Sequence, residues 1–224
     1  MCCRCVQAKP LEEIIKWWGE KLKVLVNISD FRISFNVSPG QKLPVIFTHN
    51  NTVSLSLMNW GLPATYNDIV SYNARIETIL QKRTFSQLMR YHRCIVLCNG
   101  YYEWKKEGGK SIPYLIHSPG MQLMPLGGLW TEETPGGPLC FTVITKHPRR
   151  NLAEIHDRMP FVLAQDKMDK WIDGKYFPVN PEDEFADHKG ALEFYRVSTN
   201  VNSAKYDAPD CIEKLDVPEQ GELF

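Results

Sequence analysis

The chain opens with MCCRCVQAKP, which places three cysteines among its first five residues. If Met1 is removed, Cys2 carries an α-amine and a thiol on neighbouring carbon atoms. An aldehyde condenses with such an amine to a Schiff base, and the thiol then adds to the imine carbon and closes a five-membered ring. The reference pKa of an α-amine is about 7.7–8.0, so a nucleophilic neutral fraction is present near neutral pH. Cys2 is therefore a candidate nucleophile toward an aldehyde.

A metal site and a set of disulfides are the competing explanations for the cysteines. Cys2, Cys3 and Cys5 are close enough to share an ion, but structural zinc sites usually pair cysteines from separate turns. The chain has seven cysteines, an odd number, and its start lacks the layout of a signal peptide, which disfavours a disulfide framework. We expect no metal and no cofactor. The other cysteines are expected to fill small core positions: Cys94, Cys98, Cys140 and Cys211.

Three polar clusters lie in or beside apolar runs and could supply partners for Cys2. They are NARIET at 73–78, NGYYEW at 99–104 and IHDRMP at 155–160. Glu103 lies between aromatic residues of a strand-like segment, and His156 ends a short helix-like stretch. Each also has a structural interpretation, because Glu103 could pair with a lysine at a strand end and His156 could be a hydrogen-bonded core histidine.

The arginines of these clusters are open to a structural interpretation too. Arg75 and Arg158 could form ion pairs with the nearby Glu77 and Asp157, although adjacent side chains on a strand point to opposite faces. The chain has 26 Lys and Arg against 26 Asp and Glu, so no overall charge draws it to nucleic acid or to an anionic membrane. Any nucleic-acid binding must depend on a local patch. No single cluster identifies a function.

Taken together and in order, the motifs resemble those of the SRAP family, the SOS-response-associated peptidases, also called abasic-site processing proteins. The resemblance extends from residue 1 to about residue 212. Besides the Met-Cys start and the three clusters, it includes four further stretches: Asn-Val-x-Pro at 36–39, WGL at 60–62, TVITK at 142–146 and VSTNVNS at 197–203. A string of separate motifs in one order is far more specific than any one of them.

The resemblance implies both an activity and the residues that perform it. Family members remove their own initiator methionine and crosslink the exposed cysteine to the ring-opened aldehyde of an abasic site in single-stranded DNA, as a thiazolidine. By match to the motifs, Cys2 is the nucleophile and Asn73 holds its backbone or amine near the sugar. Glu103 accepts from the α-amine and acts as a base, also in crosslink reversal. His156 donates a proton to the sugar oxygen, a role that suits its pKa.

The resemblance also implies a DNA surface, with two departures from the usual family pattern. Phosphate contacts are expected from Arg4, Arg75 and Arg158. Trp60 is expected to contact DNA, and Tyr66 is expected to stack on bases in place of the tryptophan that usually follows WGL. Cys3 replaces the glycine that usually follows the nucleophile, and a conformation that only glycine adopts easily would be strained there by about 1 kcal/mol.

The elements that must position these residues are mostly strands. Helices are predicted over 10–23, over 84–92 with Thr84 and Gln87 as a capping box, and over 166–173. Strands outnumber the helices without alternating regularly with them, so we expect an α+β fold, the SRAP-like fold, with a mixed, strongly bent or barrel-like β-sheet core and peripheral short helices. The predicted strands are 42–48, 52–60, 94–104, 113–117, 123–130, 139–145 and 194–198.

The expected organisation is a single catalytic domain over residues 1–212, followed by a flexible tail over 213–224. The function expected first is that of a self-processing thiol peptidase. It forms and reverses a covalent, lyase-type linkage to abasic single-stranded or junction DNA, and this linkage protects damaged DNA during replication. Two alternatives stay open: a non-catalytic reader of modified or single-stranded DNA, and a cysteine peptidase that acts in trans. We expect a monomer without membrane contact, inside the cell, in the nucleus of a eukaryote or the cytoplasm of a bacterium.

Overall fold

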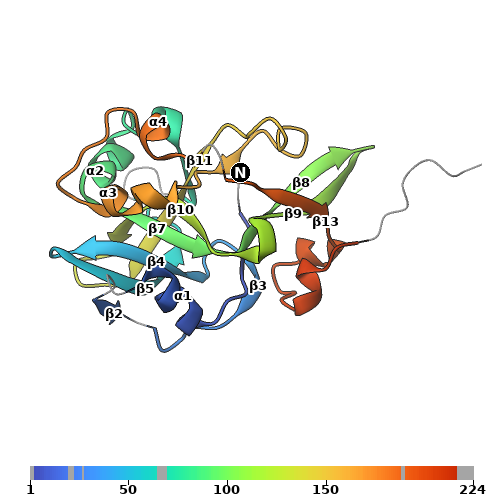
Figure 1. The fold of residues 1–224 in the computed structure, drawn as a ribbon, viewed down its shortest axis with the longest axis horizontal. Coiled ribbons are helices and arrows are strands. Elements are labelled where there is room, and N and C mark those ends of the chain that lie inside the picture. The colour runs from blue at the N-terminus through green and yellow to red at the C-terminus, as the bar shows by residue number, and fades with distance from the viewer. Residues whose placement is uncertain (1–2, 20–22, 27, 65–69, 188–189, 216–224) are drawn as a thin grey trace, which may run out of the picture.

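A closed ring of five strands forms the centre of the computed structural model, which describes residues 3–19, 23–26, 28–64, 70–187 and 190–215. Antiparallel pairs join the ring strands in the order β5-β4-β7-β10-β11, and a parallel pairing of β11 with β5 closes it. This confirms the predicted α+β fold with a barrel-like sheet (Figure 1). The ring strands are β4 (Lys42–His49), β5 (Thr52–Trp60), β7 (Arg93–Cys98), β10 (Met124–Glu132) and β11 (Leu139–Lys146).

A second sheet of five strands extends from the barrel on the side away from α2, α3 and α4 (Figure 1). The chain passes into it at Asn99, so the single strand predicted over 94–104 is two strands in two sheets. A side chain at the next residue, Gly100, would meet the Leu115 side chain at 2.9 Å and the Ile116 carbonyl at 3.0 Å. The strands, in order across the sheet, are β13 (Glu193–Arg196), β9 (Lys110–His117), β8 (Gly100–Glu107), β1 (Cys5–Gln7) and β3 (Ser34–Val37).

Three short strands attach to the barrel and were not predicted. With two or three residues each, they are too short for an alternating pattern to identify them. Both β6 and β12 pair with β11, and β2 pairs with β5. Their bounds are β2 (Val24–Val26), β6 (Asn73–Arg75) and β12 (Met159–Pro160).

The helices are short and partly differ from the prediction. The first helix ends at Trp18 rather than at residue 23, because Gly19 takes a left-handed conformation with φ +79°. The predicted capping box is wrong: the second helix starts at Arg83, its N-cap is Lys82, and no side chain caps it. The helices are α1 (Leu11–Trp18), α2 (Arg83–Tyr91), α3 (Met168–Ile172) and α4 (Pro181–Phe185), with 3₁₀ turns η1 (Ile76–Thr78), η2 (Pro119–Met121), η3 (Gln165–Lys167), η4 (Thr199–Asn202) and η5 (Pro209–Ile212).

Alternate residues of the barrel strands enter two different cores. Ile46 and Ile95 pack outward against residues of the helices, whereas Val45 and Val96 face a cluster without helical members, which fills the barrel. Each such apolar side chain contributes about 1.5–3 kcal/mol by burial. The expectation that cysteines fill core positions is confirmed for Cys94, Cys98, Cys140 and Cys211.

The C-terminal segment crosses the outer face of the second sheet before the described residues end. Leu215 still donates its N–H to the carbonyl of Arg196, and residues 216–224, most of the expected tail, lie outside the described residues. In the part of the chain that the structure describes, no helix is long and apolar enough to cross a membrane.

Candidate functional site

The N-terminal strand brings the start of the chain to Glu103. In the antiparallel pair of β1 and β8, Cys5 lies opposite Tyr101, and the N–H of Tyr102 donates to the carbonyl of Arg4 at 3.0 Å. The same register, continued by two residues, places Cys3 opposite Glu103. Because directly opposite residues of an antiparallel pair share a face, the two side chains lie on the same side of the sheet. Cys2 lies outside the described residues, one peptide bond before Cys3.

Glu103 is a buried carboxyl group that faces a histidine. Its side chain lies in a residue only 3% exposed, and Oε2 is 3.7 Å from Nε2 of His156. The other oxygen, Oε1, is buried and accepts no hydrogen bond from the described residues. Burial raises the pKa of Glu103 to about 7, against the opposing charge of the chain's N-terminal amine, while Asp157 adds to the increase. The side chain that faces Glu103 is thus a histidine and not the lysine of the structural interpretation.

His156 is held in one orientation by the backbone that follows it. Its Nδ1 accepts a hydrogen bond from the N–H of Arg158 at 3.0 Å. A neutral ring that accepts at Nδ1 carries its proton on Nε2, the atom nearest to Glu103. Burial lowers the pKa of His156, and the charge of the N-terminal amine lowers it further. The exposed Asp157 carboxylate, 3.1 Å from Nδ1, has the opposite effect, which is smaller. The neutral ring can therefore donate a hydrogen bond from Nε2, whereas only the protonated ring can give that proton up and be left neutral.

Asn73 contacts the start of the chain from the barrel. It begins β6, where it lies opposite Val143 of β11. Its Nδ2 donates to the Sγ atom of Cys3 at 3.8 Å. Three of the four predicted catalytic residues thus lie around Cys3. Asn73 contacts Cys3, Glu103 lies opposite Cys3 in the strand register, and His156 faces Glu103.

Arg158 is buried in an ion pair. The side chain is 7% exposed, and its two terminal nitrogens hold both oxygens of Glu77, at 2.7 and 3.0 Å. One of them also donates to the carbonyl of Thr145 at 2.8 Å. Burial works to raise the pKa of Glu77, but the hydrogen bonds and charge of Arg158 outweigh it and the pKa is lowered. Arg158 thus forms the ion pair that its structural interpretation allowed, with Glu77 as the partner. Its phosphate contact stays a prediction.

The other two arginines differ in exposure. Arg75 is exposed at the end of β6, opposite Thr145. Arg4 is half-buried: its Nη1 donates to Oδ1 of Asn36 at 2.8 Å and to the carbonyl of Val201 at 2.7 Å, and its guanidinium lies over the ring of Trp104 at 5.9 Å. Arg75 therefore offers a cation to solvent, whereas Arg4 connects three segments of the second sheet.

The two aromatic residues predicted to contact DNA have different outcomes. Trp60 is 1% exposed, stacks on Phe141 with ring centroids 6.0 Å apart, and donates from Nε1 to the carbonyl of Tyr72 at 2.9 Å. The expected DNA contact of Trp60 is therefore wrong, because a buried indole offers no face to a base. Tyr66 lies outside the described residues.

Sequence reasoning missed two residues of this region. Asn36 is buried, and its Nδ2 donates to the carbonyls of Val201, Ser203 and Tyr206, so two recognised motifs meet there. His147 is exposed, with Nε2 3.5 Å from Glu77. The signal for Asn36 was present in the Asn-Val-x-Pro run, whereas nothing local in the sequence indicates that His147 faces Glu77.

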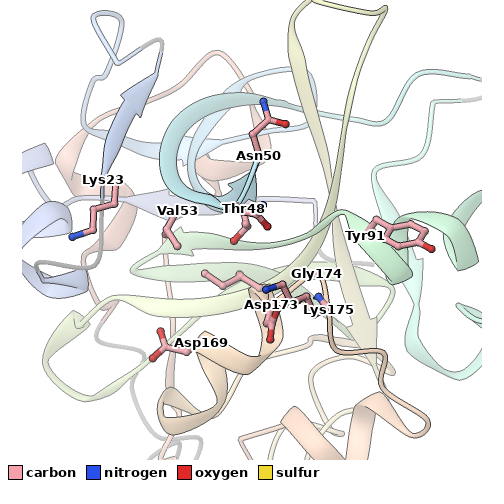
Figure 2. A pocket seen from close by; sticks show the side chains of 11 residues that line it. Lys23, Thr48, Asn50, Val53, Tyr91, Asp169, Asp173, Gly174 and Lys175 are labelled. Atoms are coloured by element: carbon pink, nitrogen blue, oxygen red, sulfur yellow. Dashed lines mark hydrogen bonds between the residues drawn. The ribbon is translucent and has the colours of Figure 1, made fainter.

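A cavity of about 920 Å³ lies elsewhere among the described residues. Figure 2 shows it between the β4–β5 turn and the end of α3, with Asn50, Tyr91 and Lys175 around it. None of the predicted site residues lines it. We place the candidate site at Glu103 and His156 instead, because a buried acid facing a histidine is an arrangement that does proton transfer, whereas cavity size alone identifies no chemistry.

The fold and the site together define a class of proteins in which a strand at the start of the chain leads past an acid–histidine pair at a small barrel. The chain belongs to the SOS response associated peptidase (SRAP) family, whose model matches residues 1–204.

Similar proteins come from bacteria and from eukaryotes. Abasic site processing protein YoqW of Bacillus subtilis (strain 168) is 30% identical over 231 residues, which cover 95% of this chain and 99% of the relative. Abasic site processing protein HMCES of Gallus gallus is 28% identical over 85% of this chain and 69% of its own length. A crystal structure of a protein from Bacteroides thetaiotaomicron has a TM-score of 0.79 at 21% identity, covering 96% of this chain and 100% of that one, and shows the same fold.

Proposed function

We propose that this chain is an abasic-site processing protein that crosslinks Cys2 to abasic sites in single-stranded DNA after removal of Met1. The observation that carries the proposal is the pair of buried Glu103 and half-buried His156, with Glu103 opposite Cys3, the neighbour of Cys2, in the β1–β8 register. Membership of the family and the names of the relatives support the same role. Residues 1–212 act in it as one catalytic domain.

The first step is hydrolysis of the bond between Met1 and Cys2. One water molecule is consumed, methionine leaves with a new carboxyl group, and Cys2 gains an α-amine. Glu103 suits the role of base in this step, because a carboxyl group with a pKa of about 7 can accept a proton near neutral pH and release it again. The step is intramolecular, so it needs no substrate pocket for other proteins.

The second step is ring closure on the DNA aldehyde. The protonated form of His156 gives its Nε2 proton to the ring oxygen of the sugar as the sugar opens, and the ring becomes neutral. The anomeric hydroxyl loses its proton to solvent water, and Glu103 accepts a proton from the α-amine of Cys2. The amine condenses with the aldehyde carbon and one water molecule is lost. The thiol then adds across the C=N bond: sulfur bonds to carbon, and the thiol proton passes to nitrogen. The product is a thiazolidine, and its reversal uses the same two groups.

The DNA surface follows from what is exposed beside this site. Arg75 and His147 lie at the ends of β6 and β11 and are open to solvent. The cation of Arg75 gives a local positive charge at this edge of a chain without net charge, and the His147 ring adds a hydrogen-bonding group beside it. The protein acts on DNA as a monomer.

Methionine removal is tested on a precursor whose N-terminus carries several extra residues, so that a host aminopeptidase cannot produce the mature end. Intact mass measured over time in vitro should show cleavage before Cys2 in the wild type. Glu103→Gln and Cys2→Ala precursors should stay uncut. A wild-type precursor that stays intact would contradict self-processing.

A further inference from the structure

Cys3 is the one described cysteine that is not buried. The other five described cysteines are 0–4% exposed, whereas Cys3 is half-exposed. The thiol of Cys3 accepts from Asn73 at 3.8 Å. A half-exposed thiol next to an amide donor is accessible to a small electrophile, as reactive cysteines are.

A second observation points to a reaction at this thiol. Glu103 is 97% buried, and its Oε1 has no hydrogen-bond partner among the described residues. By the strand register, the Glu103 and Cys3 side chains lie on the same face of the sheet. A carboxylate so placed can take the thiol proton. Burial lowers the pKa of the nearby Arg4, and the effect of Cys3 opposes that change.

The geometry points to Cys3 as a second thiol of the reaction, which captures the opened abasic aldehyde as a hemithioacetal and holds its carbon beside the amine of Cys2. This inference rests on the proposed function and adds a residue to it. A glycine at this position, the usual residue of the family, could not act in this way.

The capture step balances without an oxidant or a reductant. Glu103 takes the thiol proton, sulfur bonds to the aldehyde carbon, and the carbonyl electron pair moves to oxygen, which receives the Nε2 proton of protonated His156 as that ring becomes neutral. The reverse step expels the thiol and restores the carbonyl, with which the amine of Cys2 then condenses. Cys3 cannot replace Cys2 in the stable product, because ring closure through its sulfur would include the peptide bond and give a much larger ring.

The kinetic test compares rates of heat-stable adduct formation with abasic single-stranded DNA in single turnover. Capture raises the local concentration of aldehyde at the amine, so Cys3→Ser and Cys3→Ala should both be about tenfold slower than the wild type. Both variants still form the stable adduct, because Cys2 is intact. Rates equal to or above that of the wild type would overturn the role of Cys3 and leave the proposed function standing. A wild type without any adduct would instead overturn the proposed function.

A spectroscopic test does not depend on rates. In Cys2→Ala protein, ¹³C NMR of an oligonucleotide labelled at the aldehyde carbon should show a carbon bonded to both sulfur and oxygen. The matched control is Cys2→Ala/Cys3→Ser, in which that signal should be absent. Its absence from Cys2→Ala, or its persistence in the double variant, would refute capture by Cys3.

Discussion

The protonation of two side chains decides what the site can do. Glu103 and His156 face each other with their charges suppressed, because burial raises the pKa of the acid and lowers that of the base. A protonated acid and a neutral histidine can coexist near neutral pH, and in that state the acid can give one proton and the histidine can take one. The sequence predicted both residues, but it could not predict their contact, which depends on packing between β8 and the loop before β12.

The raised pKa of Glu103 makes stability depend on pH. The folded protein keeps Glu103 protonated up to about pH 7, whereas the unfolded chain ionises near 4.5, so the wild type loses stability as the pH rises through this window. Glutamine has no proton to lose, so Glu103→Gln should not show this loss. The difference in free energy of unfolding between the variant and the wild type should therefore favour the variant more at pH 8 than at pH 4, by about 1–3 kcal/mol. Urea unfolding at both pH values measures this. An equal effect of the substitution at pH 4 and pH 8 would show that the pKa of Glu103 is not raised in the fold.

The proposed role of His156 in opening the sugar predicts that the effect of its loss depends on the substrate. His156→Ala should slow crosslinking to an abasic site by about 100-fold or more, the usual range for a lost general acid. Its reaction with a simple aldehyde, which has no ring to open, should be close to that of the wild type. Parallel time courses with the two aldehydes measure the difference. Equal slowing with both would assign His156 to thiazolidine closure.

At the scale of elements, the long strands were predictable and the junctions were not. The alternating pattern predicted 52–60 correctly, because nine residues are enough to show a period of two. The break at Asn99 is set by contacts between distant segments, since its side chain accepts from Ala8 and donates to Met121. Trp60 was misassigned for the same reason: only the parallel pairing of β5 with β11 shows that it is enclosed.

The burial of Trp60 predicts a loss of stability rather than of DNA contact. Trp60→Ala should lower the free energy of unfolding by about 3–5 kcal/mol, as for other large aromatic residues truncated in a core. Trp60→Phe keeps most of the packing and should cost less. Chemical denaturation gives both values. At a temperature where Trp60→Phe is fully folded, its affinity for DNA should equal that of the wild type. A large fall in the affinity of this variant would show that Trp60 contacts DNA after all.

The contrast between two arginines can be measured by salt dependence. Arg75 is exposed, so Arg75→Ala should lower the slope of log K against log salt by about 0.7, the value for one phosphate of a single strand. Arg158 is bound to Glu77, so Arg158→Met should mainly destabilise the fold, by leaving the carboxylate without its partner. Binding titrations at several salt concentrations test both. An equal fall in slope for Arg158→Met would show that its guanidinium reaches a phosphate.

At the scale of the whole molecule, the start of the chain is built into the site. The strand β1 lies between β8 and β3 in the second sheet, so Cys5–Gln7 are held by backbone pairing on both sides. The equal numbers of acidic and basic residues leave DNA binding to local contacts and to the proposed covalent bond. The sequence did not predict a strand over these three residues, and composition alone excluded only a strongly basic DNA-binding protein.

The most direct test of the account is a heated denaturing gel of the protein with labelled abasic single-stranded DNA. The wild type should give a slowly migrating band that survives heating, with the mass of the chain from Cys2 plus the DNA minus one water. Cys2→Ser should give such a band only after borohydride reduction, because its amine still forms a Schiff base. Without reductant, Cys2→Ala should give none. A band of equal heat stability from Cys2→Ala would contradict the assignment of Cys2 as the crosslinking residue.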